Sequence, residues 1–221
     1  MSQVKKKNAK AAAFITSVFI LFAFLVFFKG MIPRANAHPH PVKIDGVVLA
    51  QPLAITNFKL TDIRGKAFDK HNLKGRWTMM FFGFTNCGAV CPTTLAELNK
   101  MYKSLQAELP DDKLPQVVMI SVDPERDTLA RLSDYVAAFN PHFTGARGEE
   151  TDLIALEKQL HIVSAKMQAD GQGKDHYTIN HSAEIILFNP NADVQAFLSY
   201  PHEAGQMVKD YKAILAVESK S

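Results

Sequence analysis

The sequence predicts an α/β fold, in which helices flank a sheet that contains a parallel pair of strands. Two nearly continuous apolar runs, residues 77–84 and 116–122, have the length and composition of strands that are buried on both faces. The segment between them, residues 93–108, carries apolar residues at helical spacing. A strand, a helix and a second strand in this order place the two strands parallel to one another in the same sheet.

The rest of the domain, which we place at residues 47–221, continues this alternation. Apolar periodicity and turn residues predict further strands at residues 58–62, 184–188 and 194–198, and further helices at residues 127–140, 151–161 and 201–217. We expect Asp127 and Thr151 to cap the two helices that begin with them. The last two strands flank a short turn and form an antiparallel hairpin, which completes the sheet.

A membrane anchor is predicted before the domain. Residues 1–10 form a basic tail with four lysines, and the apolar segment 11–30 contains 18 successive uncharged residues from 11 to 28. That length is about enough for a helix to cross a bilayer. The lysines keep the tail cytoplasmic, so residues 31–46 form an extended linker to a domain on the periplasmic side of a bacterial cytoplasmic membrane.

A cleaved signal peptide is the alternative interpretation of the N-terminus. Ala35-Asn36-Ala37 matches an Ala-x-Ala cleavage site, and cleavage near Ala37 would release a secreted domain. We prefer the anchor because the apolar run is long for a signal peptide and two basic residues separate it from the candidate site. Both interpretations place the domain outside the cytoplasm.

Composition excludes two broad classes of protein. The formal net charge is +3, and much of it comes from the N-terminal lysines, so there is no basic stripe for nucleic acid. With 47% hydrophobic and 21% charged residues, the chain is typical of a globular domain. Its two cysteines are too few for a scaffold held together by disulfides.

The two cysteines, Cys87 and Cys91, follow directly after the first buried strand. Pro92 is favoured at the first position of a helix, which places Cys91 at a helix N-terminus, where a lowered thiol pKa makes cysteine both a nucleophile and a metal ligand. A structural disulfide or two buried apolar side chains are the alternatives, but a disulfide over four residues closes too short a loop to stabilise much. A cysteine pair at this corner is the thioredoxin-like arrangement.

Four stretches of the sequence together resemble the SCO/SenC family, the copper-handling assembly factors of cytochrome c oxidase. They are residues 82–87 with 91–95, residues 121–128, Asp134-Tyr135 and residues 177–182. The resemblance covers residues 47–217 and implies a thioredoxin-like fold with copper bound by Cys87, Cys91 and His181. The chain departs from the family pattern at Gly88-Ala89, where the family usually has Pro-Asp, so that a carboxylate is missing between the two cysteines.

The chemistry of these side chains agrees with that implication. Two thiolates and an imidazole form a soft donor set that suits Cu(I). A lone histidine is more commonly a hydrogen-bonded structural residue, but His181 precedes strand 184–188, whose loop faces the cysteine corner in a thioredoxin-like sheet. We expect Asp123 at the same sheet edge, either as a partner of the site or of a docking protein, or as a plain turn residue.

The leading functional hypothesis is a membrane-tethered copper-binding protein that delivers copper, as Cu(I) or Cu(II), to the copper-bearing subunit of cytochrome c oxidase. The alternative is a thiol–disulfide oxidoreductase, in which Cys87 and Cys91 form the redox pair that reduces the cysteines of the oxidase copper site. A peroxidase-like sensor ranks last. Another periplasmic copper chaperone or a thioredoxin-like reductase would be a further partner.

Overall fold

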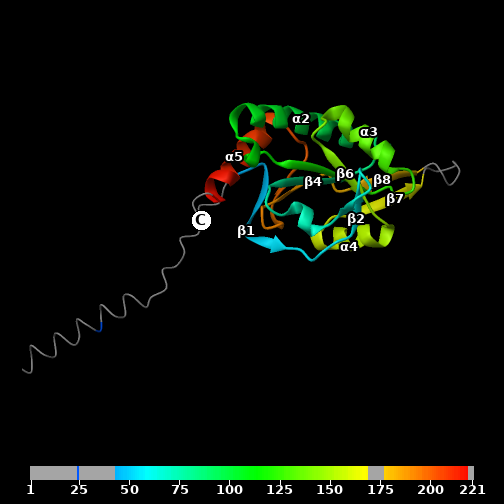
Figure 1. The fold of residues 1–221 in the computed structure, drawn as a ribbon, viewed down its shortest axis with the longest axis horizontal. Coiled ribbons are helices and arrows are strands. Elements are labelled where there is room, and N and C mark those ends of the chain that lie inside the picture. The colour runs from blue at the N-terminus through cyan, green and yellow to red at the C-terminus, as the bar shows by residue number, and fades with distance from the viewer. Residues whose placement is uncertain (1–23, 25–42, 169–176, 219–221) are drawn as a thin grey trace, which may run out of the picture. The chain divides into compact units, whose positions relative to one another are not determined.

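The computed structural model describes residue 24 and residues 43–168 and 177–218 (Figure 1). The chain divides into two compact units, Met1–His40 and Pro41–Ser221. The predicted tail, anchor, cleavage site and most of the linker therefore lie outside the described residues, apart from Phe24. Within the described part of the chain, no helix has the length and apolar character needed to cross a membrane.

The second unit is built around an eight-stranded sheet with the order β1-β10-β9-β4-β5-β6-β2-β3. The strands are β1 (Gly46–Ala54), β2 (Leu60–Asp62), β3 (Ala67–Phe68), β4 (Thr78–Gly83), β5 (Gln116–Ser121), β6 (Thr144–Arg147), β9 (Ile185–Phe188) and β10 (Asp193–Leu198). β4 is parallel to β5 and antiparallel to β9, and β9 is antiparallel to β10. The structure therefore confirms both the predicted parallel pair and the predicted hairpin.

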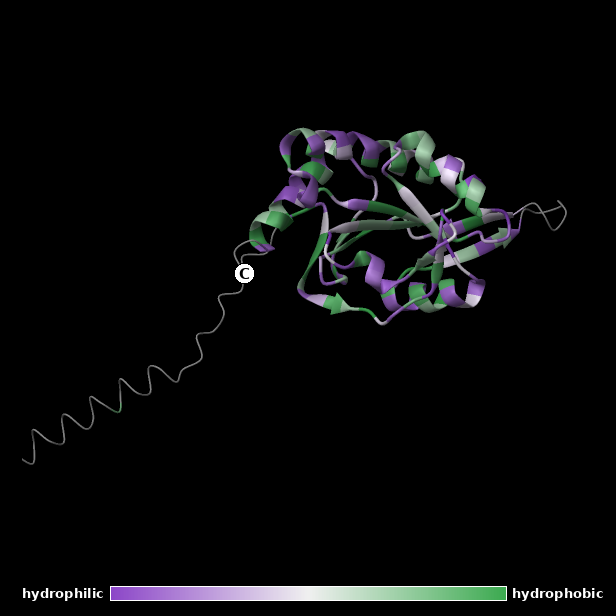
Figure 2. Cartoon of the chain, viewed as in Figure 1, coloured by the Kyte–Doolittle hydropathy of each residue, from purple (hydrophilic) through white to green (hydrophobic). Residues whose placement is uncertain are grey.

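The central strand β4 is buried on both faces, as its apolar sequence predicts. Met79 and Phe81 point into one hydrophobic core, and Met80 and Phe82 point into the other, because successive side chains of a strand alternate between faces. Figure 2 shows the central strands as mostly hydrophobic and the helices as mixed in character. Burying side chains of this size contributes about 1.5–3 kcal/mol each, which fixes β4 firmly in the sheet.

Helices cover both faces of the sheet and complete three layers (Figure 1). Leucine and other apolar residues of α2 (Val90–Glu108), α3 (Leu129–Phe139) and α5 (Ala204–Glu218) pack into the core that contains Met79. On the opposite face, α4 (Glu150–Leu160) packs into the core that contains Met80. Short 3-10 helices at Lys70–Leu73 and Asp111–Lys113 lie in the connections.

A separate two-stranded sheet, β7 (Ser164–Gln168) with β8 (Tyr177–His181), was not predicted from the sequence. Its strands are antiparallel and place Ser164 opposite His181. Along β8, Ile179 is buried whereas Thr178 and Asn180 are exposed, so one face of this β7–β8 hairpin packs against the domain and the other faces solvent. The sequence also gave no expectation of β1, β3 or β6.

Four expected helix starts differ from the structure, and one of them is α5, which begins at Ala204 and not at residue 201. α2 begins at Val90, so Pro92 is its third residue; its missing N–H is still harmless there, because the first turn has no intrahelical acceptors. α3 is capped by Thr128, whose side chain accepts a hydrogen bond from the Arg131 N–H, and not by Asp127. α4 begins after Glu149, so Thr151 lies inside the helix and does not cap it.

Candidate metal centre

The cysteine pair lies where β4 leaves the sheet and α2 begins. Cys91 is the second residue of α2 and only 1% exposed, whereas Cys87 lies in the preceding loop and is half-buried. The Cys87 N–H donates to the Phe84 carbonyl at 3.1 Å, and the Cys91 N–H donates to the Cys87 sulfur at 3.4 Å. These bonds turn the loop so that both thiols, which are free, face the same side.

Gly83, the last residue of β4, provides the space for the Cys91 sulfur. A Cβ at this position would lie 2.9 Å from Cys91 Sγ and 3.1 Å from the Cε of Met119. Real Cβ atoms do not approach other atoms so closely, so a side chain here would displace the thiol. The glycine thus lets the sulfur lie directly against the end of the central strand.

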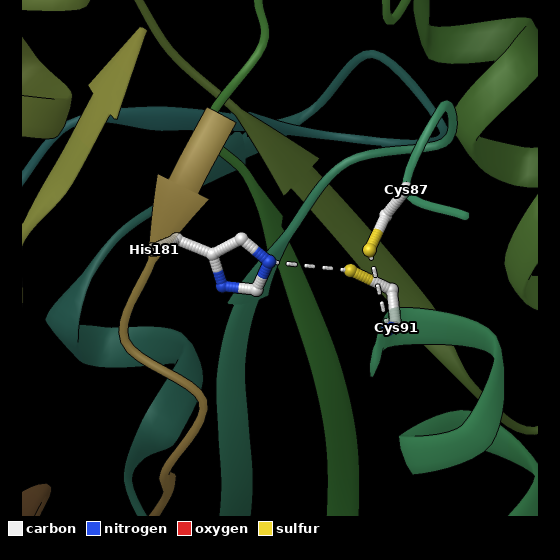
Figure 3. A group of neighbouring side chains, drawn as sticks. All are labelled: Cys87, Cys91 and His181. Atoms are coloured by element: carbon white, nitrogen blue, oxygen red, sulfur yellow. Dashed lines mark hydrogen bonds between the residues drawn. The ribbon is translucent and has the colours of Figure 1, made fainter. Parts of the chain in front are cut away.

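His181 reaches the thiols from the end of β8 (Figure 3). Its Nε2 atom lies 3.5 Å from Cys91 Sγ, and its Nδ1 atom lies 2.8 Å from the carbonyl oxygen of Ser182. Because a carbonyl oxygen only accepts, Nδ1 carries the ring proton, and the lone pair of Nε2 is directed at the sulfurs. The ring also stands edge-on to Phe84, with 5.9 Å between centroids.

The three side chains form the single group within the described residues that has the composition and proximity to hold a metal ion. Their candidate ligand atoms all lie within 4.8 Å of one another. Donors bound to one ion at about 2.0–2.3 Å lie roughly 3.5–4 Å apart, so a small closure would suffice. The expected juxtaposition of the remote imidazole with the cysteines is therefore observed, while metal binding by these atoms stays a prediction.

The expected low pKa of Cys91 is wrong. Burial raises the pKa of the Cys91 thiol and the adjacent Cys87 thiol raises it further, whereas the backbone of Phe84 has the opposite, smaller effect. Removal from water outweighs the position at the helix N-terminus because desolvation disfavours the thiolate. In the absence of a metal, Cys91 is a neutral thiol at neutral pH and a weak nucleophile.

Asp127, which we expected to cap a helix, instead supports the cysteine loop. Its carboxylate is fully buried and accepts hydrogen bonds from the Thr85 N–H at 3.1 Å, the Thr85 hydroxyl at 2.5 Å and the Ser121 hydroxyl at 2.7 Å. Arg131 donates to the Thr85 hydroxyl at 2.7 Å and to the side chain of Asn86. The two residues before Cys87 are thereby tied to the start of α3.

Asp123 lies at the predicted sheet edge, just after β5, and is fully buried. Its burial contradicts the expectation of a docking residue, although its backbone carbonyl does form the expected turn by accepting from the Arg126 and Asp127 N–H groups. Its carboxylate accepts from Arg126 Nε at 2.5 Å and from the Tyr177 hydroxyl at 2.6 Å. Burial and the Asp123 carboxylate both raise the pKa of Tyr177, which therefore stays a donor.

Sequence reasoning also gave no special role to His202, which we treated as a surface or packing residue. His202 is 6% exposed, and its Nε2 atom lies 2.9 Å from the Ala183 carbonyl oxygen. Ala183 is two residues beyond His181, so this contact anchors the segment that leaves the site. Burial lowers the pKa of His202, which keeps its ring neutral.

Comparisons with known proteins agree on one family. The chain matches the family model described as SCO1/SenC over residues 49–216. It is 34% identical over 160 residues to the mitochondrial protein SCO2 homolog of Mus musculus, an alignment that covers 72% of this chain but only 62% of that protein. It is also 32% identical over 158 residues to a putative copper-binding protein of Stutzerimonas stutzeri, covering 70% of this chain and 74% of that protein.

A solved structure adds a likeness in three dimensions. The structure of Bradyrhizobium japonicum ScoI with copper bound superposes with a TM-score of 0.63 at 32% sequence identity. The match covers 72% of this chain and 98% of that one. The match to the family model, over residues 49–216, contains all three candidate ligands, Cys87, Cys91 and His181.

Proposed function

The chain belongs to the SCO1/SenC family, and we propose that it binds copper through Cys87, Cys91 and His181 and passes it on in the assembly of cytochrome c oxidase. One observation carries this proposal. Two sulfurs and one imidazole nitrogen, from a loop, a helix and a remote strand, lie within 4.8 Å of one another. A thiolate-rich set of this kind selects Cu(I) over harder cations.

Each side chain has a distinct part in taking up copper. Cys87 is half-buried, so its sulfur is the accessible one that an incoming copper ion meets first. Cys91 lies beneath it and loses its thiol proton when the metal binds, because a thiolate is the ligand. The Ser182 carbonyl holds the proton of His181 on Nδ1, which leaves Nε2 as the third donor.

Location and partners follow from the N-terminal sequence and the family. In this proposal, residues 11–30 anchor the chain in the bacterial cytoplasmic membrane and residues 47–221 form the periplasmic domain, with cleavage near Ala37 as the alternative. The copper-bearing subunit of the oxidase is the recipient. Because the pair binds metal only when reduced, a periplasmic thioredoxin-like reductase is a second partner, and another copper chaperone is the donor.

Thiol–disulfide exchange is a second candidate function, favoured by the closeness of the two free thiols. In this reaction the Cys87 thiolate attacks a disulfide of the target, and one target sulfur leaves as a thiol after taking up a proton. Cys91 then attacks the mixed disulfide, so the target gains its second thiol and the chain becomes a disulfide. The approach of His181 to the Cys91 sulfur favours metal binding over this role, because disulfide exchange does not need an imidazole there.

A copper titration of the full chain in detergent tests the proposal. We expect one copper per reduced chain, and a competing Cu(I) chelator should show a loss of affinity of about 100-fold in Cys87→Ser or Cys91→Ser. The variant His181→Ala should lose less affinity than either cysteine variant, because both thiolates that suit Cu(I) remain. Unchanged affinity in Cys87→Ser or in His181→Ala would refute the assignment. Full disulfide reductase activity in metal-free His181→Ala would instead favour the second function.

A further inference from the structure

The candidate site has two arms that come from different parts of the fold. The cysteine arm is the loop after β4 with the start of α2, and the histidine arm is the β7–β8 hairpin. A single short segment between β5 and α3 contacts both arms through two buried carboxylates, Asp123 and Asp127, each 0% exposed. Burying a carboxylate is unfavourable unless hydrogen bonds satisfy it, so the partners of these two groups are strongly specified.

We propose that Asp123 and Asp127 are positioning residues that divide this work: Asp127 holds the cysteine arm and Asp123 holds the histidine arm. The proposal rests on the proposed function, because it assigns these arms as the two parts of one copper site. Neither carboxylate is a ligand. Each acts through a hydroxyl-bearing side chain of the arm that it holds.

The histidine arm is held by a latch that we define as Asp123, Arg126 and Tyr177. Tyr177 is the first residue of β8, and its hydroxyl donates to Asp123 at 2.6 Å. Arg126 donates to the other oxygen of Asp123 at 2.5 Å and to the Tyr177 carbonyl oxygen at 3.0 Å. The latch thus fixes the start of the strand whose last residue is His181.

The same arginine also connects the latch to Phe84, the ring that stands against the imidazole. The guanidinium carbon of Arg126 is 3.7 Å from the centroid of the Tyr177 ring and 5.9 Å from that of Phe84. Phe84 in turn stands edge-on to the His181 ring. Stacking of this kind orients planar groups, so the latch sets both the position of β8 and the wall against which the imidazole rests.

The cysteine arm is held by a similar pair of hydrogen bonds to a buried carboxylate. The Thr85 hydroxyl donates to Asp127 at 2.5 Å, much as the Tyr177 hydroxyl donates to Asp123. The Thr85 N–H adds a second bond at 3.1 Å. Thr85 is two residues before Cys87, so these bonds direct the chain into the turn that presents the sulfur.

Because a different carboxylate holds each arm, the two arms can move independently. Opening the latch would withdraw His181 while Cys87 and Cys91 remain held by Asp127. Copper would then stay on two thiolates with its third position free for a ligand of the recipient. This arrangement assigns the exchangeable coordination position to the hairpin and the retained positions to the corner of the main sheet.

The two hydroxyls allow a matched experiment in the full chain. Tyr177→Phe and Thr85→Val each delete one hydroxyl next to a buried carboxylate and keep the shape of the side chain. Thr178→Val changes the exposed neighbour of Tyr177 on β8 and is the control. Hydrogen exchange of the metal-free protein is measured for amides 177–182 and 85–91, and electron paramagnetic resonance of the Cu(II)-loaded protein reports nitrogen coupling to copper.

We expect a crossed result. Tyr177→Phe should raise exchange at least several-fold in residues 177–182 alone and should weaken the nitrogen coupling, with about a 10-fold loss of Cu(II) affinity. Thr85→Val should raise exchange in residues 85–91 alone and keep the nitrogen coupling. Thr178→Val should match the parent chain in every measurement.

The outcomes separate this proposal from the function on which it rests. If the parent chain takes up no copper, the proposed function fails, and the exchange data alone decide whether the latch holds the hairpin. If either hydroxyl deletion loosens both arms equally, or if Tyr177→Phe exchanges like Thr178→Val, the division of labour is overturned.

Discussion

The two arms of the site differ in how strongly the fold supports them. The cysteine arm begins at β4, which is hydrogen-bonded to β5 on one side and to β9 on the other, with cores on both faces. The histidine arm is a two-stranded sheet outside the main one, with an exposed outer face. Isolated hairpins are marginally stable, so the second arm depends on a few polar contacts. Under the proposed function, this difference would let the cysteine arm retain copper while the histidine arm frees a coordination position.

The largest expected effect comes from breaking the latch at its charged partner. Arg126→Met leaves the buried Asp123 carboxylate without its cation and should lower the free energy of unfolding by about 3 kcal/mol, as for other broken buried ion pairs. Arg131→Met is the matched change on the cysteine arm. Arg131 is exposed and donates to uncharged oxygens, so Arg131→Met should lower the free energy of unfolding by only about 1 kcal/mol. Denaturant titration measures both, and equal losses would contradict the contrast between the arms.

Gly83→Ala tests the cysteine arm directly. The added methyl meets the Cys91 sulfur at 2.9 Å, so we expect a loss of about 1–3 kcal/mol in unfolding free energy together with weaker Cu(I) binding. Gly88→Ala is the control, because a Cβ at that position meets nothing within 4 Å. Chelator competition and denaturant titration report the two effects. Parent-like copper affinity in Gly83→Ala would show that the sulfur does not bind from the position seen here.

The two thiols of the metal-free, reduced chain should differ in reactivity. Cys87 is half-buried and Cys91 is buried with a raised pKa, so iodoacetamide should modify Cys87 at least about 10-fold faster. The raised pKa leaves Cys91 mainly as the neutral thiol between pH 7 and pH 9, so its rate should stay low but rise by about 10-fold per pH unit with the small thiolate fraction, without levelling off. Mass spectrometry of timed samples gives both rates. Fast modification of Cys91 at pH 7 would contradict the account of its environment, and the denatured chain should lose the difference.

The smallest effect is expected at the exposed edge of the hairpin. Lys166 forms an ion pair with Glu125 at 2.8 Å, in which both side chains are well exposed. Solvent and salt screen such pairs, so Lys166→Ala should leave the melting temperature and the hydrogen exchange of β8 unchanged. Increased exchange of β8 in this variant would mean that a surface contact, and not the latch, holds the histidine arm.

Sequence patterns predicted the cysteine arm better than the β7–β8 hairpin. β4, α2 and β5 follow from long apolar runs and helical periodicity, and the cysteine pair stands out because no other cysteine competes with it. β7 and β8 mix polar and apolar residues, since one of their faces is exposed, so no continuous apolar run marks either strand. From the residues alone, His181 would be interpreted as a hydrogen-bonded structural histidine. The chain's resemblance to the SCO/SenC family made it a candidate ligand.

Some properties of the site depend on the tertiary structure and could not be predicted from spacing. Asp127 has the sequence position of a helix cap, and only the packed loop shows that its carboxylate is buried against Thr85. The helix N-terminus suggested a lowered pKa for Cys91, whereas the depth of burial, which no local pattern encodes, raises it. Local signals thus located the reactive residues and misjudged their environment.

The central claim is that both arms bind the same copper ion, and X-ray absorption of the Cu(I)-loaded full chain tests it most directly. The account predicts two sulfur ligands and one nitrogen ligand in the parent chain, and loss of the nitrogen alone in His181→Ala. A spectrum with sulfur ligands only in the parent chain, or one that is identical in His181→Ala, would contradict it.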